Sequence, residues 1–297
     1  MNANRRQSKP ARALLHLAAR LRRMRRALLL AIPYLLLLGW LLSGGGKGDL
    51  RPDELYAARE TPVWKAPDRE HWFGTTAGGA DLFELSRRAM AGSVSVAVLA
   101  VSLGIGLALL AVSLSVFDER ESRFDWIDRL ARALGAIPGL VALAILTGGG
   151  GGGLGLVIAG LAMVVALPLC PVLTAWFREG EAGFDILAAG VAGLSRREIV
   201  LGRVLPPVLR RLPGVFAALV PAAVLAEMAL SFLGFAGGRL SVGAMVARGQ
   251  DYLIEAPWMA IYPGLFATAV VLVLSLLGWR VSVALRTGPL PLVLQSP

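Results

Sequence analysis

The chain is poor in the residues from which most catalytic and metal sites are built. It has a single cysteine, Cys170, and two histidines, His16 and His71. One cysteine excludes a disulfide-stapled scaffold, and the histidines belong to no metal-ligand or Ser/His/Asp pattern. Only 17% of the residues are charged, whereas soluble domains average about 25%. These shortages argue against an ordinary water-soluble enzyme.

The sequence also lacks a phosphate-binding loop. No GxxxxGK[ST] pattern occurs, so the backbone cradle that holds nucleotide phosphates is missing. Gly150, Gly152 and Gly155 match a dinucleotide fingerprint by letter, but they overlap a run of glycines with no strand before it. We therefore expect no catalytic residue, cofactor site or metal site in this chain. Any ATP and Mg²⁺ that its work requires should bind a separate ATPase.

Hydrophobic residues make up 56% of the chain, and the mean hydropathy is +0.66. They gather in six runs of about 17–25 residues, enough to cross a ~30 Å hydrocarbon core at ~1.5 Å per residue. Only helices or closed barrels can span a bilayer, and alternating strand patterns are absent from the sequence. The prediction is an all-α integral membrane protein with six transmembrane helices, at 27–43, 93–117, 131–147, 154–177, 214–233 and 259–279.

Basic residues predict how the chain lies across the membrane. The net charge is +10, and residues 1–26 hold nine Lys and Arg residues and no acid. A hydrophobic run follows directly, which favours a charged flank of a membrane segment over a nucleic-acid site. Together with 118–130, 178–213 and 280–297, this segment carries about twice as many Lys and Arg residues as 44–92, 148–153 and 234–258, the segments on the other side. The positive-inside rule therefore predicts that both termini are cytoplasmic.

Alternatives remain for the N-terminal part. We interpret 27–43 as an uncleaved anchor, because a signal peptide would have a shorter apolar region and a clear cleavage site. Ala11–Arg26 has leucines at helical spacing among arginines, which fits either an interfacial helix on the inner leaflet or a frayed basic tail. The segment 44–92 contains Pro52, Pro62 and Pro67 and mixed charge. It is predicted to be an external loop without a core of its own.

The predicted cytoplasmic loop 178–213 carries the most specific pattern. It contains Leu187-Ala188-Ala189, then Gly193, and Leu205-Pro206 begins twelve residues after that glycine. This arrangement resembles the "EAA" loop of ABC importer membrane subunits, in which Glu-Ala-Ala, three residues and Gly precede Leu-Pro at that distance. The chain departs from the family pattern at Leu187, where the family has Glu.

Two flanking stretches resemble one branch of that family, the C-type membrane subunits of dipeptide/oligopeptide/nickel-type permeases. His71–Thr75, followed by Gly79, Asp81 and Ser86-Arg87, is similar to its "HPFGTDxxGRD…SR" segment, with Thr76 and Ala80 replacing an Asp and an Arg. Glu227–Gly234 is similar to its "EASLSFLG" segment. The matches together extend from about residue 71 to residue 279.

The resemblance implies a type I ABC importer membrane-subunit fold, with the permease domain at 93–279, in the inner membrane of a bacterial cell. It implies a translocation pathway for a small solute, with peptide the first choice and nickel or another small molecule as alternatives. The implied partners are a second membrane permease subunit, two cytoplasmic ATPases that bind ATP and Mg²⁺, an external solute-binding protein and the lipid bilayer, with no nucleic acid.

The same resemblance assigns roles to two groups of residues. The implied ATPase-docking residues are Leu187, Ala188, Ala189, Gly193, Leu205 and Pro206. The candidate pathway or gate residues are Glu227, Ser231, Phe232 and Gly234.

Two questions stay open at this point. Glu227 is an acidic residue deep inside a predicted span, and a carboxylate there is costly unless it faces the bundle interior or a wet cavity. It either lines the pathway or gate, or it is a structural hydrogen-bond partner between helices. The second question is whether the chain transports at all. A transport-inactive scaffold or degenerate permease is the alternative, favoured slightly by Leu187 and the polyglycine turn, and ATPase-dependent uptake would discriminate.

Overall fold

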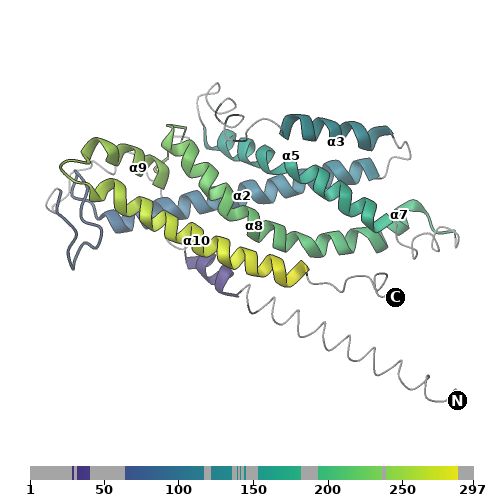
Figure 1. The fold of residues 1–297 in the computed structure, drawn as a ribbon, viewed down its shortest axis with the longest axis horizontal. Helices are drawn as coiled ribbons and strands as arrows, with labels where there is room; N and C mark the ends of the chain where they lie inside the picture. The colour runs from purple at the N-terminus through teal and green to yellow at the C-terminus, as the bar shows by residue number, and fades with distance from the viewer. Residues whose placement is uncertain are drawn as a thin grey trace, which may run out of the picture.

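The computed structural model describes residues 29, 32–40, 64–116, 122–135, 139, 141, 144, 153–181, 193–235 and 239–286. Within these ranges the chain is helical and has no strand, and an isolated antiparallel bridge joins Thr75 and Asp81. Figure 1 shows the long helices running side by side in an elongated bundle. The predicted all-α class is confirmed.

Four long helices dominate the bundle: α2 (Leu82–Val116), α5 (Leu154–Glu181), α8 (Leu205–Phe232) and α10 (Trp258–Arg286). Each contains a stretch long and apolar enough to cross a membrane, so the chain is a multi-pass membrane protein. They coincide with four of the six predicted spans. The other two lie only partly within the described residues: 32–40 of the first is helical, and α3 (Ser122–Gly135) overlaps the start of 131–147.

Helix α2 begins at Leu82, inside the segment predicted as the external loop 44–92. Asp81 starts the helix, because its carboxylate accepts a hydrogen bond from the Glu84 backbone N–H at 3.0 Å, which is the geometry of an N-cap. Glu84 then pairs with Arg87 and Arg88 within the first turns. Hydropathy did not predict the first turns of α2, because it detects apolar stretches and these turns are polar. Their backbone hydrogen bonds form nevertheless, so the helix includes them.

The second half of the predicted loop 178–213 is also helical, and α5 continues to Glu181. Helix α7 (Arg196–Ile199) and the π-helical segment η2 (Val200–Val204) lead into α8 without a break. Together they form a span candidate of 36 residues, Arg197–Phe232, or about 54 Å at 1.5 Å per residue. Since a hydrocarbon core is ~30 Å thick, this helix extends well beyond it.

The helices pack through small residues, which permit close approach between membrane helices. A side chain at Gly278 of α10 would collide with the Ala217 carbonyl of α8. Nearby, the Ser282 hydroxyl donates to the Gly214 carbonyl at 2.5 Å. Tyr34, which is buried, donates to the Ala217 carbonyl at 3.4 Å. The helical residues 32–40 therefore lie against α8.

Large apolar side chains cover the outside of the bundle. On α2 they recur every three or four residues, which makes a leucine stripe along one face of the helix, formed by Leu99, Leu103, Leu107, Leu110 and Leu114, each about half exposed. A soluble protein rarely exposes so large an apolar patch. The stripe is the surface expected against lipid or against another membrane subunit.

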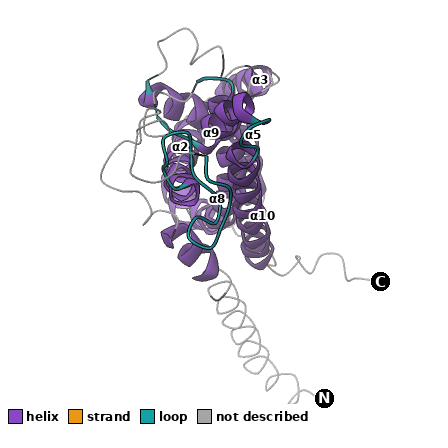
Figure 2. Ribbon diagram, turned by 90° about the vertical axis from the view of Figure 1, so that its left-hand side faces the viewer, coloured by secondary structure: helices purple, strands orange, loops and turns teal. Residues whose placement is uncertain are grey.

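The two ends of the bundle differ. One end carries the segment 64–81 and the short helix α9 (Val242–Gly249), with the 3₁₀ turn η3 (Gln250–Tyr252) after it. Helix α7 lies at the opposite end, and α10 runs from the α9 end toward it (Figure 1). Figure 2 looks toward the α9 end, where the described loops gather in front of the helices. We call these the α9 end and the α7 end.

Candidate functional site

Three of the predicted docking residues, Gly193, Leu205 and Pro206, lie at or near the α7 end. Leu187, Ala188 and Ala189 fall outside the described residues. Gly193 is exposed and has φ +82, with nothing within 4 Å of the place where a Cβ would be. Such a φ is in the left-handed region that favours glycine, which suits a turn at this position. The glycine therefore joins the predicted docking segment to the helix that follows.

Ser195 opens that helix with a reciprocal cap. Its hydroxyl accepts from the Glu198 backbone N–H at 3.4 Å, and the Glu198 carboxylate accepts from the Ser195 backbone N–H at 2.8 Å. This is a capping box, whose S-x-x-E signature was readable in the sequence. The cap fixes where the long helix starts, two residues after Gly193.

Leu205 and Pro206 lie within the continuous helix, not in a loop. Pro206 occupies the first turn of α8, and the Leu205 backbone N–H donates to the Val200 carbonyl across the π-helical segment. Proline cannot donate the usual backbone bond, and π-type turns often occur where a helix absorbs such an irregularity. The Leu-Pro pair therefore marks a local irregularity between the docking segment and the membrane-spanning part.

Helices α5 and α8 are tied together at this same end. Arg211 of α8 makes two hydrogen bonds to the Glu179 carboxylate of α5, at 3.0 and 3.4 Å. Its guanidinium also lies 5.2 Å from the centre of the Trp176 ring, within the range of a cation–π contact. Gly180 packs so closely on Val204 that a Cβ there would lie 2.8 Å from the valine side chain. Motion of α8 at this end would therefore involve α5.

Glu227 lies near the other end of α8 and is almost completely buried, with 1% of its side chain exposed. Its Oε1 accepts a hydrogen bond from the Ser231 hydroxyl at 3.0 Å, so two of the predicted pathway residues are brought together. The same oxygen lies 3.5 Å from Nη2 of Arg239. Charged groups in a membrane segment are expected to pair in this way.

Phe232 and Gly234 form the end of α8 instead of joining Glu227. Gly234 has φ +95, and its backbone N–H donates to the Ser231 carbonyl at 3.1 Å. The Phe235 N–H donates to the Leu230 carbonyl at 3.0 Å, which completes a Schellman motif. The phenylalanine at 232 is 39% exposed. The predicted segment thus ends the helix and redirects the chain back toward the bundle.

Arg239 is the residue of this site that sequence reasoning missed. It follows the turn, and its side chain is 14% exposed. Its Nη1 lies 3.1 Å from the place where a Cβ of Gly92 would be, so the guanidinium is located between α2 and α8. A buried contact partner twelve residues away, across a turn, leaves no periodic signal in the sequence.

Helix α9 fixes the position of that turn. Gly243 packs on the backbone of α8 so closely that a Cβ would collide with the Met228 carbonyl. The Ser241 side chain caps α9 by accepting from the Ala244 N–H at 3.2 Å. With Leu240 and Val242 also buried, the chain on the C-terminal side of Arg239 is held against the bundle.

The segment 64–81 forms an ordered cap at the α9 end. His71 Nδ1 lies 2.9 Å from the Asp81 carboxylate, and the Trp258 indole N–H of α10 donates to the Thr75 carbonyl at 3.3 Å. Phe73 stacks on Tyr262 of α10 at 5.3 Å. Thr75, Thr76 and Ala80 of this segment are fully buried. The family-like residues of 71–81 therefore build this cap.

Lys65 and Asp68 add an ion pair to the cap, with 2.5 Å between Nζ and Oδ2. The hydrogen bond from Lys65, followed by that from the His71 backbone N–H, lowers the pKa of Asp68 to about 2. The same contact raises the pKa of Lys65. The pair links the start of the cap to the turn that positions His71.

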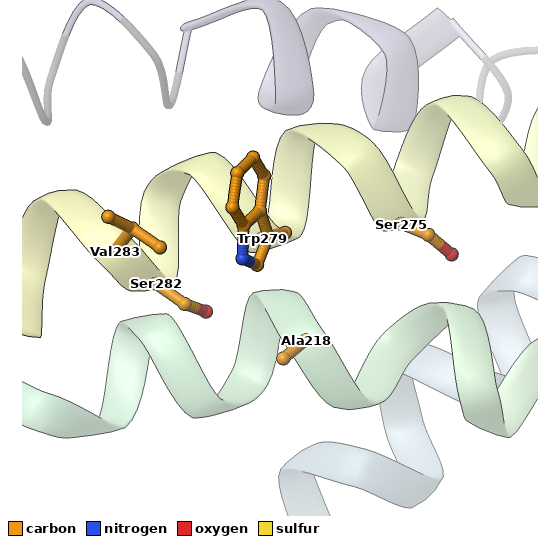
Figure 3. A pocket seen from close by; sticks show the side chains of 5 residues that line it. All are labelled: Ala218, Ser275, Trp279, Ser282 and Val283. Carbon is orange, nitrogen blue, oxygen red and sulfur yellow. The ribbon is translucent and has the colours of Figure 1, made fainter.

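The groove shown in Figure 3 is separate from both groups of predicted residues. It has a volume of about 280 Å³ and is lined by Ala218 of α8 and by Ser275, Trp279, Ser282 and Val283 of α10. Trp279 is 59% exposed, so the groove lies on the outside of the bundle. Among the described residues, no group of three or more His, Cys, Asp and Glu side chains is placed to hold a metal ion.

Comparison with known proteins identifies the family. No protein-family model matches the chain. The chain is 31% identical over 221 residues to the oligopeptide transport system permease protein OppC of Mycobacterium tuberculosis, which covers 71% of this chain and 74% of that protein. It is 31% identical over 229 residues to a putative peptide transport system permease protein of Brucella suis, with 72% and 73% covered. OppC of Salmonella typhimurium is 29% identical over 218 residues, with 72% of each chain covered.

These matches confirm the resemblance that the motifs indicated. The alignments cover about 70% of the chain at about 30% identity. The described helices are long and apolar enough to supply membrane spans, which a permease needs. The chain belongs to the ABC transporter permease family, in its dipeptide/oligopeptide/nickel-type branch.

Proposed function

We propose that this chain is the permease subunit of an ATP-driven importer and forms, with a second permease subunit, the translocation pathway for a peptide. The observation that carries the proposal is the match to peptide transport permeases over about 70% of the chain. The buried Glu227 near one end of α8 adds a polar group inside the bundle, where a solute pathway would need one. Nickel is the alternative solute.

The proposed energy source is a pair of cytoplasmic ATPases that bind ATP and Mg²⁺. They would dock on the segment around Leu187, Ala188 and Ala189, where small residues let a short helix enter a cleft. The long helix that starts at Ser195 supports this proposal, because it continues through Leu205 and Pro206 to Glu227. A push on the docking segment would therefore tilt the same helix that carries the buried carboxylate.

The proposed topology has six spans with both termini in the cytoplasm of a bacterial cell. It makes the α7 end cytoplasmic and the α9 end external, where a solute-binding protein would deliver the peptide. The placement of α7 at one end of the bundle supports this arrangement, since the segment 178–213 that contains it holds six arginines and basic residues favour the cytoplasmic side.

The direct test of subunit composition is purification of the tagged full chain from its own host in a mild detergent. The proposal expects an ABC ATPase, a second permease and a solute-binding protein to be identified by mass spectrometry. It also expects ATP turnover of the purified complex to rise when the binding protein is added with trialanine. A chain that purifies without any ATPase would contradict the proposal.

A transport-inactive scaffold remains the competing function, because Leu187 occupies the position of the family's Glu. A scaffold would retain the ATPase but show no peptide-stimulated turnover. The variant Leu187→Glu separates the two functions. In a working permease this change should be neutral or beneficial, whereas in a degenerate permease it should restore turnover that the unmodified chain lacks.

A further inference from the structure

We propose that Arg239 is a positioning residue that latches the turn after α8 onto α2 and α8, and that transport requires the Glu227–Arg239 pair to separate. By latch we mean the contact of Arg239 with Glu227 and Gly92. The inference rests on the proposed transport function for its second half. Its first half, the closing of the α9 end by Arg239, stands on geometry alone.

The position of Arg239 is the first argument. Its Nη2 lies 3.5 Å from Glu227 Oε1 on α8, and its Nη1 lies beside Gly92 on α2. One side chain therefore reaches two helices from a connection that belongs to neither. Because Gly92 has no Cβ, it leaves the space that the guanidinium occupies. Removal of the guanidinium would free α2, α8 and the turn from a shared contact.

The incomplete bonding of the cluster is the second argument. Among the described residues, three buried polar atoms have no hydrogen bond of normal geometry: Ser93 Oγ, Glu227 Oε2 and Arg239 Nε. Ser93 nevertheless lies close enough to the Glu227 carboxylate to interact with it. Buried polar groups are normally paired, and an exception calls for an explanation. Here the ion pair offsets part of the cost of burial, while exposure to water would satisfy all three atoms. The ion pair favours the buried state and hydration of the three atoms favours the water-exposed state, so the cluster suits a contact that forms and breaks.

The third argument is that the described chain on both sides of the latch packs closely on the bundle. Gly243 is held against the Met228 carbonyl, and a Schellman motif ends α8 at Gly234. The chain is therefore anchored on each side of Arg239, by the end of α8 and by α9. If α8 moved relative to α2, Arg239 would lose its contact with one of these two helices. Tilting of α8 would therefore open the α9 end.

The test measures the accessibility of residue 93, which lies next to Gly92 and is fully buried. The full chain carries Cys170→Ala and Ser93→Cys, so it has one thiol, and it is expressed in host membranes with its partners. Labelling with N-ethylmaleimide, which crosses membranes, reports opening in either orientation. We expect Arg239→Gln to raise the labelling rate by at least about tenfold, because removing one partner of a buried pair strongly destabilises the closed form.

Two further variants separate a latch from simple loss of folding. The double variant Glu227→Gln with Arg239→Gln leaves no unpaired buried charge, and it should still label faster than the parent. Arg88→Gln is the matched control, because Glu84 keeps its two hydrogen bonds from Arg87. It should label like the parent. Unchanged, slow labelling in the double variant would overturn the latch.

ATP turnover of the assembled complex tests the link to transport. If separation of the pair is part of the cycle, the double variant should turn over ATP faster without peptide and respond less to peptide. Normal turnover together with fast labelling would overturn the second half of the proposal. If no ATPase assembles with the parent chain, the proposed function fails, while the labelling result still decides whether the latch exists.

Discussion

At the residue scale, a few contacts determine how the α9 end is built. Glycines at 243 and 92 leave the space that a backbone carbonyl and a guanidinium occupy. Glu227, Ser231 and Arg239 then form a polar cluster inside an apolar bundle. The family motif pointed to Glu227 and Ser231 as candidates. It could not predict Arg239, because the contact between Arg239 and Glu227 depends on the path of the chain after the end of α8.

Gly243→Val tests the close approach of α9 to α8. The added side chain would meet the Met228 carbonyl and the Phe232 backbone nitrogen, and backbone atoms cannot move aside cheaply. Overpacking of this kind typically costs about 1–3 kcal/mol, so the thermal midpoint of the purified full chain should fall. Gly106→Val is the matched control, because nothing lies within 4 Å of its Cβ position. Equal losses in the two variants would contradict the packing described for α9.

Acid titration tests the Lys65–Asp68 pair. The pKa of Asp68 is lowered to about 2 in the folded chain, below its ordinary value near 3.9. A lowered carboxyl pKa stabilises the fold above the unfolded value and loses that contribution as the pH falls from about 4 toward 2. The thermal midpoint of the parent should therefore fall toward that of Asp68→Asn over this range. In a Lys65→Met background, Asp68→Asn should change the thermal midpoint less than it does in the parent. If the midpoints of the parent and Asp68→Asn differ by the same amount at every pH, the ion pair is not the source of the stabilisation.

At the scale of elements, the helix from Arg196 to Phe232 is the central feature. It joins the predicted docking segment to the polar cluster, with a π-helical turn and Pro206 between them. Helix α5 is fastened to its α7 end by Arg211 and Glu179. The helix therefore links events at one end of the bundle to contacts at the other.

Ala189→Arg tests docking on the segment before this helix. A small residue is expected where a short helix enters a cleft of the ATPase, and an arginine there would clash and leave a charge poorly solvated. An unpaired buried charge costs several kcal/mol, and about 1.4 kcal/mol corresponds to tenfold in association. The amount of ATPase retained on the tagged membrane subunit should fall by orders of magnitude. Parental retention would show that the ATPase docks elsewhere.

Hydropathy predicted the apolar centres of α2, α5, α8 and α10 but not their ends. Helix ends such as Asp81 and Ser195 lie among polar residues, where side-chain caps determine the start of the helix. Their capping patterns were present in the sequence and were readable. The packing of the cap on α10 was not readable, because Thr75 bonds to Trp258 and Phe73 stacks on Tyr262, both more than 180 residues away along the chain.

At the scale of the whole molecule, the bundle has two unlike ends: the α7 end, where docking is proposed, and the α9 end, which carries the cap and the proposed latch. The leucine stripe of α2 and the four span candidates require a membrane around the middle. The proposed orientation places the α7 end in the cytoplasm.

Thiol labelling tests that orientation. In a Cys170→Ala chain, Glu70→Cys would report the α9 end, since the Glu70 side chain is 80% exposed, and Leu194→Cys would report the α7 end. A membrane-impermeant maleimide should label position 70 in intact spheroplasts and position 194 only in inside-out vesicles. Labelling of both positions from the same side would contradict the topology.

Peptide uptake tests the central claim most directly. Host cells that lack this chain are given the parent, Leu187→Glu or Ala189→Arg, and accumulation of radiolabelled trialanine is measured with and without depletion of ATP. The account predicts that the parent and Leu187→Glu restore ATP-dependent uptake and that Ala189→Arg does not, with similar amounts of chain in the membrane. Uptake that is independent of this chain, or that continues at the parental rate in Ala189→Arg, would contradict an ATPase-coupled permease.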